Sequence, residues 1–167
     1  MEVRVRHATE EDFEALAALV VRANATYREW ADAGWTPPGI EHERLRWREQ
    51  FDDTAAWIAV AVEGGELLGC VSFTDARTQD GRGRPIPRLA HLSRMFVDPA
   101  NWGRGIGSLL LDRALVEMRD RGYRQAQLFT PERNSRSRRF YERHAWQPGE
   151  ETRGWHGLVL TRYSLEL

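Results

Sequence analysis

The second half of the chain holds a group of glycines, an asparagine and a tyrosine whose types and spacing suit a catalytic site. Gly103, Gly105 and Gly107 stand between an apolar run and a run with helical periodicity, and Asn134 and Tyr141 follow seven positions apart. Glycines at a helix start let backbone amides approach a phosphate, because the first-turn N–H groups lack intrahelical partners and the helix dipole is positive there. A tyrosine phenol, with a pKa near 10, can donate a proton to a leaving group. The set suits an enzyme that holds a pyrophosphate-bearing carrier beside a proton donor.

Periodicity and turn residues predict the elements that position these groups. An apolar strand over 90–97 ends at Asp98-Pro99, a helix follows over about 105–121, and a strand over 125–130 lies parallel to the first through a right-handed crossover. A short helix is expected over 134–144, and Thr9 with Asp12 resembles a capping box before the first helix. The other predicted elements are a strand over 2–6, helices over 13–23 and 40–51, strands over 55–62, 66–74, 146–150 and 158–167, and loops over 30–39 and 75–88.

Length and composition favour one domain over residues 1–167. A chain of 167 residues with 41% apolar content can bury a core of its own. No run approaches the roughly 18 apolar residues of a membrane span, and the first eight residues lack the apolar centre of a secretory signal. We therefore expect a cytoplasmic protein with no membrane partner. Cys70 is the single cysteine, and its run LLGCVSF favours a buried structural role.

The charges are divided unevenly along the chain. The net charge is −1 and every basic residue is Arg, but residues 1–75 hold seven Arg against fifteen acids, whereas residues 101–143 hold ten Arg against five acids. The basic excess coincides with the glycine turn, and it lacks the interleaved stacking aromatics of a nucleic-acid surface. We expect an anion at the glycine turn and no nucleic-acid partner.

The strand, glycine turn and short helix together resemble the GNAT superfamily of N-acetyltransferases, closely over residues 90–146 and more loosely elsewhere. In that family a strand ending in valine and proline precedes the pattern Q/R-x-x-G-x-G/A, which binds the pyrophosphate of acetyl-CoA. The matching positions here are Val97, Pro99, Gly105, Gly107, Asn134, Phe140-Tyr141 and Ala145-Trp146, and the opening RHATEEDFEAL is also similar. Trp102 replaces the usual Gln or Arg, which weakens one side-chain contact and leaves the backbone contacts intact.

The resemblance implies an α/β (α+β) fold, with a mixed, mostly antiparallel sheet of about seven strands flanked by four helices. It implies acetyl-CoA as acyl donor, no metal, and acetyl transfer to a primary amine by direct attack, with Tyr141 as general acid. The implied cofactor-binding residues are Met95, Phe96, Val97, Gly103, Arg104, Gly105, Ile106, Gly107, Ser108 and Asn134. Asn134 is equally suited to an ordinary helix cap. Arg136, Arg138 and Arg139 either meet the cofactor's 3′-phosphate or solvate a helix.

His91 stands where many relatives carry a glutamate that deprotonates the amine, and a histidine near pKa 6.5 suits that role. A hydrogen-bonded structural histidine is the alternative. Ser93 is predicted to share its face and to position the same water. The resemblance places the acceptor pocket near 27–35 and 150–156, with Tyr27, Trp30, Trp35 and Trp155 as wall residues. Aromatic rings beside the carboxylates of these stretches favour a cationic amine.

Two other functions remain open at this stage. One is a non-catalytic acyl-CoA-binding sensor, against which Tyr141 argues. The other is an enzyme that acetylates a protein amino terminus or lysine, whereas the aromatic loop favours a closed pocket and a small-molecule amine. A covalent acetyl-cysteine route is disfavoured because Cys70 lies outside the matched motifs. A homodimer that exchanges its last strand is a further possibility.

Overall fold

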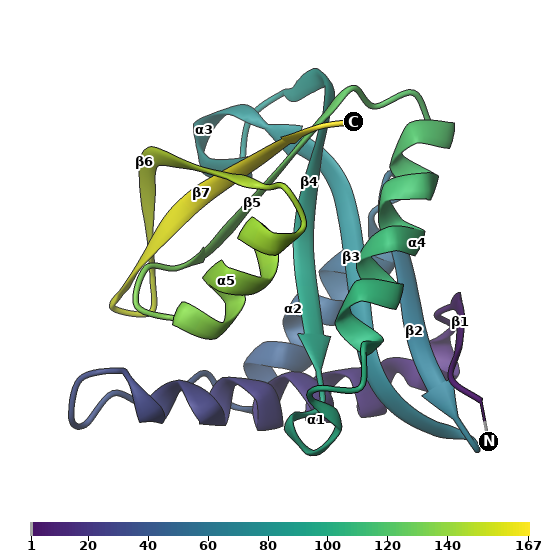
Figure 1. The fold of residues 1–167 in the computed structure, drawn as a ribbon, viewed down its shortest axis with the longest axis vertical. Coiled ribbons are helices and arrows are strands. Elements are labelled where there is room, and N and C mark those ends of the chain that lie inside the picture. Colours follow the sequence, from purple (N-terminus) through teal and green to yellow (C-terminus); the bar gives the residue numbers. More distant parts are fainter. Residues whose placement is uncertain (1) are drawn as a thin grey trace.

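The computed structural model describes residues 2–167, which form one seven-stranded sheet with helices on both faces (Figure 1). The strand order is β1-β2-β3-β4-β5-β7-β6, and every neighbouring pair is antiparallel except β4 and β5. The strands are β1 (Arg4–His7), β2 (Trp57–Glu63), β3 (Glu66–Arg77), β4 (Pro85–Val97), β5 (Gln125–Pro131), β6 (Gln147–Trp155) and β7 (Leu158–Glu166). The predicted mixed, mostly antiparallel sheet is confirmed.

Four helices of more than one turn cover the sheet: α1 (Phe13–Ala25), α2 (Ile40–Asp52), α4 (Ile106–Asp120) and α5 (Ser135–Arg143). The segments η1 (Glu10–Asp12), η2 (Thr26–Glu29), η3 (Pro99–Asn101) and α3 (Thr78–Gly81) are single turns. The expected cap is formed before α1, where the Asp12 carboxylate accepts a hydrogen bond of 2.8 Å from the Thr9 amide. None of the helices within residues 2–167 combines the length and apolar character needed to cross a membrane.

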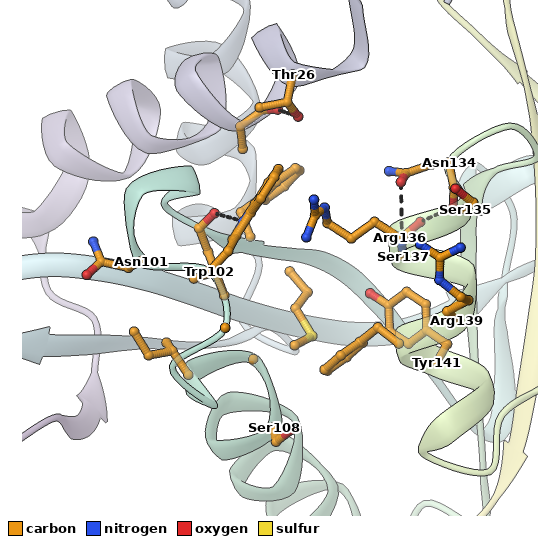
Figure 2. Close-up of a pocket in the computed structure, with 18 of the residues that line it drawn as sticks. Thr26, Asn101, Trp102, Ser108, Asn134, Ser135, Arg136, Ser137, Arg139 and Tyr141 are labelled. Atoms are coloured by element: carbon orange, nitrogen blue, oxygen red, sulfur yellow. Dashed lines mark hydrogen bonds between the residues drawn. The ribbon is translucent and has the colours of Figure 1, made fainter. Parts of the chain in front are cut away.

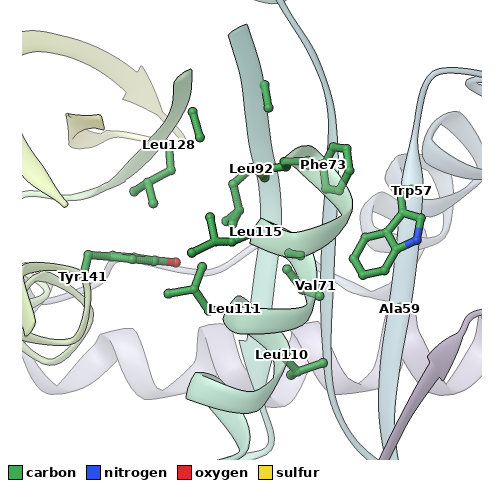
Figure 3. Packing of buried hydrophobic residues seen from close by; sticks show 14 of the residues in the cluster. Trp57, Ala59, Val71, Phe73, Leu92, Leu110, Leu111, Leu115, Leu128 and Tyr141 are labelled. Atoms are coloured by element: carbon green, nitrogen blue, oxygen red, sulfur yellow. The ribbon is translucent and has the colours of Figure 1, made fainter. Parts of the chain in front are cut away.

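Two apolar clusters lie on opposite faces of the sheet. One joins α4 and Tyr141 of α5 to β2–β5, and the other joins α1 and Trp47 of α2 to the reverse face. Figure 3 shows the Tyr141 ring pointing from α5 toward Leu111 and Leu115 of α4. Burying a leucine side chain contributes about 1.5–3 kcal/mol, so this packing holds α4 and α5 in fixed relation to the sheet.

Two predicted boundaries are wrong. The expected loop over 75–88 is shorter, because β3 runs to Arg77 and β4 begins at Pro85, and the two form a hairpin in which Asp75 pairs with Ala90 and Arg77 pairs with Pro85. The strand expected over 146–150 runs on to Trp155, and its second half pairs with β7 after an irregularity between Pro148 and Thr152. Polar and glycine residues at these positions obscured strands that are specified by pairing with the next strand of a hairpin and not by their own hydrophobic pattern.

Candidate functional site

The strands β4 and β5 lie side by side for only three residues. Residues 89–91 of β4 pair with residues 125–127 of β5, although β4 continues to Val97 and β5 to Pro131. β5 pairs with β7 over its whole length instead. Beyond His91, one edge of β4 therefore carries backbone N–H and C=O groups without a strand partner, and these are available to a bound molecule.

A first cavity of about 490 Å³ opens beside this free edge (Figure 2). It is lined by the end of β4, the first turn of α4, one side of α5 and the end of α1. Nine of the ten residues predicted to bind the cofactor line this cavity, and the exception is Arg104. The nine are Met95, Phe96, Val97, Gly103, Gly105, Ile106, Gly107, Ser108 and Asn134.

The first turn of α4 presents its amides to the first cavity. Gly105 caps the helix with a φ of +78°, a left-handed conformation that glycine adopts at little cost, and no side chain caps the turn. The first-turn N–H groups of α4 therefore remain free for an anion. Gly107 allows α5 to pack closely against α4, because a Cβ at this position would lie 3.2 Å from the Phe140 ring.

Arginine placement at the first cavity differs from the prediction. Arg104 is not among the residues that line the cavity, and its guanidinium donates to Asn101 at 2.5 Å and to Glu63 at 3.0 Å. Arg136 lines the cavity, and its guanidinium lies 3.9 Å from the ring centre of Trp102. The Trp102 indole in turn donates to the Val97 carbonyl at 3.1 Å. The tryptophan that replaces the family's Gln or Arg thus positions a cation from α5.

Tyr141 lies in the wall of the first cavity with 7% of its surface exposed. Burial, and to a lesser extent the nearby Tyr27, raise the pKa of its phenol above the ordinary value of 10.0. The phenol therefore stays protonated at neutral pH, and the proton needed by a general acid is present. Burial also raises the pKa of Tyr27 to about 12, an effect that its hydrogen bond with Asn134 partly offsets.

Asn134 caps α5 and also lines the first cavity. Its side-chain oxygen accepts from the Ser137 amide at 3.2 Å, which caps α5, and the same side chain lines the first cavity beside Tyr27. Helix capping and a place in the cavity wall are therefore compatible at this residue.

A second cavity, of about 620 Å³, lies on the other side of Tyr27 and Phe96, which line both cavities. Its walls come from α2, β4, the ends of β5 and β6, and the turn after β3. Trp155 is among its lining residues, as expected, but Trp30 lines the first cavity instead. Trp35 lines neither; its ring lies 6.3 Å from that of Trp155, and its indole donates to the His156 carbonyl.

His91 lines the second cavity, but its environment differs from the expected one. Burial, followed by the charges of Arg153 and Arg46, lowers its pKa from 6.5 to about 4. The imidazole is therefore neutral at physiological pH and is a weaker base than the sequence suggested. Ser93 also lines this cavity, where its hydroxyl is engaged with Ser72 at 2.9 Å and Gln50 at 3.1 Å.

A β-bulge at Ser93 explains why Arg94 was not predicted at the site. Ser72 pairs with Arg94 and Phe73 pairs with Leu92, so Ser93 is the extra residue on β4. An extra residue reverses the alternation of faces along a strand. His91, Arg94 and Phe96 therefore all line the second cavity.

The charge of the second cavity reverses the expectation of an acidic, cation-binding pocket. Among the described residues that line it are Arg46, Arg82, Arg94 and Arg153, against the carboxylates of Glu43 and Asp80. The acidic residues of the first 75 positions lie largely elsewhere, and two of them, Glu10 and Glu14, pair with arginines on α2. The net charge of a sequence segment therefore does not predict which charged side chains line a cavity.

Cys70 is fully buried in the cluster beneath α1. Burial raises the pKa of its thiol to about 12, so the nucleophilic thiolate is scarce at neutral pH. Neither cavity includes it among its lining residues. Its place in the fold supports the structural role that the sequence suggested.

Comparison with known proteins gives a consistent result. A family model described as Acetyltransferase (GNAT) family matches residues 8–146. A mycothiol acetyltransferase of Beutenbergia cavernae is 30% identical over 151 residues, covering 87% of this chain but 45% of that protein, so the chain spans about half the length of this curated relative. An N-acetyltransferase structure from Staphylococcus aureus Mu50 has a TM-score of 0.70 and 26% identity, covering 99% of both chains. The PaiA N-acetyltransferase of Thermoplasma acidophilum, solved in complex with coenzyme A, has a TM-score of 0.70, 18% identity and coverage of 97% and 98%.

Proposed function

Because the chain belongs to the acetyltransferase (GNAT) family, we propose that it transfers an acetyl group from acetyl-CoA to a small-molecule primary amine by direct attack. The observation that carries this proposal is the divergence of β4 from β5. It creates a first cavity bounded by the uncapped turn of α4 on one side and by Tyr141 on the other.

The first cavity fits the donor by its chemistry. Free amides at the start of α4 suit a pyrophosphate, and Arg136, Arg139 and Arg143 of α5 line the same cavity with positive charge. The free edge of β4 offers hydrogen bonds to an amide-containing arm. Bound there, acetyl-CoA supplies the thioester whose acetyl carbon the amine attacks.

The proposed reaction assigns one step to Tyr141. As the new C–N bond forms and the C–S bond breaks, the Tyr141 phenol donates its proton to the sulfur. The proton released by the amine returns to the phenolate through water, which leaves the N-acetylated amine and free thiol. Backbone amides on the open edge of β4 stabilise the developing charge on the carbonyl oxygen. His91, neutral in its cavity, accepts a hydrogen bond from the incoming amine or its water.

The test is thiol release from acetyl-CoA across a panel of amino acids, polyamines, aminoglycosides and short peptides. We expect at least one small amine to raise release at least about tenfold above the hydrolytic background, as a positioned reaction should. Tight CoA binding without release by any amine would contradict the enzyme and favour a sensor. Release with peptides alone would favour a protein-modifying enzyme.

A further inference from the structure

The second cavity concentrates unpaired polar groups. Within residues 2–167, eight buried side-chain nitrogen or oxygen atoms lack a hydrogen-bond partner. Five of them belong to residues that line this cavity, namely Asn24 with two atoms, His91, Arg94 and Arg153, while the other three are indole nitrogens of tryptophans outside it. Unpaired buried polar groups are uncommon in folded proteins, so their clustering at one cavity indicates a place built for a polar ligand.

The positive charges of the cavity are only partly compensated. Arg94 is neutralised by Glu43, since the two form a buried ion pair with exposed side-chain fractions of 10% and 1%. Arg46 pairs with Glu49, at a contact where about half of each side chain is exposed to solvent. Surface pairs of this kind contribute little and release their arginine readily to another anion.

Arg153 is held only loosely by its anionic partner. Its side chain is 21% exposed and lies on β6, with the guanidinium 3.9 Å from the ring centre of Phe129. Its Nε atom forms an ionic contact with an Asp80 oxygen at 3.5 Å, and the Asp80 side chain is 69% exposed. This contact does not have the geometry of a hydrogen bond, so Nε has no hydrogen-bond partner among the described residues. The Phe129 ring fixes the guanidinium plane, and an incoming carboxylate, whose planar geometry arginine matches, can replace Asp80.

We propose that the acceptor is a primary amine that also carries a carboxylate, as amino acids do, and that Arg153 and Arg46 bind that carboxylate. This inference rests on the acetyl transfer proposed above and specifies its acceptor. Arg153 and Arg46 are also the two charges that depress the pKa of His91, so both act on the position where β4 diverges from β5. A carboxylate bound by them places an amine on the same molecule toward Tyr27 and the first cavity.

The experiment compares thiol release for matched pairs of amines that differ only in the carboxylate: tryptophan with tryptamine, phenylalanine with phenethylamine, and glutamate with 4-aminobutyrate, which keeps one carboxylate at a greater distance. We expect the amino acid of each of the first two pairs to have a kcat/KM at least about tenfold higher than its partner, the loss typical of one unpaired charged contact. Aminomethylphosphonate and glycine form a further pair that separates a carboxylate from another anion.

Variants test the assigned residues. Arg153→Gln and, separately, Arg46→Gln should raise KM for the preferred amino acid at least about tenfold and leave that of the matched amine without a carboxylate within about twofold. The control is Arg119→Gln, an exposed arginine of α4 that lines neither cavity. Calorimetric binding of the N-acetyl amino acid to the protein without CoA should weaken in the same two variants, which gives a readout independent of turnover.

The outcomes separate the inference from the proposed function. Release with carboxylate-free amines or polyamines but not with amino acids would overturn the inference while acetyl transfer stands. Equal losses for the amino acid and its carboxylate-free partner in both arginine variants would also overturn it. If no amine of any kind produced thiol release, the proposed function itself would fail.

Discussion

The guanidinium of Arg136 lies 3.9 Å from the ring centre of Trp102, so a cation on α5 is held against the glycine turn that precedes α4. Both residues line the first cavity, and the Trp102 indole is itself fixed by its bond to the Val97 carbonyl. The contact lies in the cavity where the proposed function places a pyrophosphate against the free amides of α4. Arg136 is thus placed to supply the side-chain contact that Trp102 cannot make.

Removal of Arg136 should weaken CoA binding. Hydrogen bonds to charged groups contribute about 1.5–3 kcal/mol, so Arg136→Gln should raise the Kd for CoA about tenfold or more, measured by calorimetry. Trp102→Ala should have a smaller effect, and the double variant should be no worse than Arg136→Gln because the two residues act together. Fully additive losses, or an unchanged Kd in Arg136→Gln, would contradict the assigned contact.

A methyl group at position 107 should push α5 away from α4. In Gly107→Ala the new Cβ would lie 3.2 Å from the Phe140 ring, and overpacking of this kind costs about 1–3 kcal/mol. We expect a lower free energy of unfolding in urea and weaker CoA binding. Gly39→Ala is the matched control, because a Cβ there meets nothing within 4 Å. Equal behaviour of the two variants would show that the approach of the helices does not need glycine.

The buried ion pair between Glu43 and Arg94 should be sensitive to loss of one partner. Glu43→Gln leaves the Arg94 guanidinium buried with no compensating charge, which costs about 3–5 kcal/mol. Glu41→Gln, two residues earlier on α2 and 82% exposed, should change the free energy of unfolding by less than about 1 kcal/mol. Urea denaturation of the two variants tests the difference, and a small loss in Glu43→Gln would mean that Arg94 finds solvent or another partner.

Acid should destabilise the protein partly through His91. Its pKa falls from 6.5 to about 4 on folding, so between these values the unfolded chain binds more protons than the native one. This contribution is therefore present above pH 6.5 and is lost as the pH falls toward 4, by up to about 3 kcal/mol. His91→Gln should lose less stability than wild type between pH 7 and pH 4.5 in urea unfolding. Parallel pH profiles would show that His91 is not held neutral by the fold.

Much of the fold was predictable because local signals agree with the tertiary structure. The cap formed by Thr9 and Asp12 and the glycine entry to α4 are sequence-local features, and both are present in the structure. The placement of Asn134 and Tyr141 in one cavity followed from the family pattern. The residues that specify the cap, and those that specify the glycine entry, lie within about one helical turn of each other, whereas Asn134 and Tyr141 are seven positions apart.

The second cavity could not be predicted in the same way. The bulge at Ser93 places Arg94 on the same cavity as His91, and a period of two predicts the opposite face. Arg153 is placed at the cavity by the pairing of β6 with β7. The sequence of β6 has no alternation of apolar and polar residues that would predict this strand. The charge of this cavity therefore depends on strand register and pairing, and the acidic composition of the first 75 residues was misleading.

The role of Tyr141 is the central claim and can be tested directly. The measurement is kcat for amine-dependent thiol release in Tyr141→Phe, with the Kd for CoA measured alongside. The control is Tyr123→Phe, which removes a hydroxyl that bonds Asp75 away from both cavities. We predict a fall in kcat of at least about 100-fold in Tyr141→Phe, as expected for loss of a general acid, with the CoA affinity retained. A kcat within about threefold of wild type, at unchanged CoA affinity, would contradict the assignment.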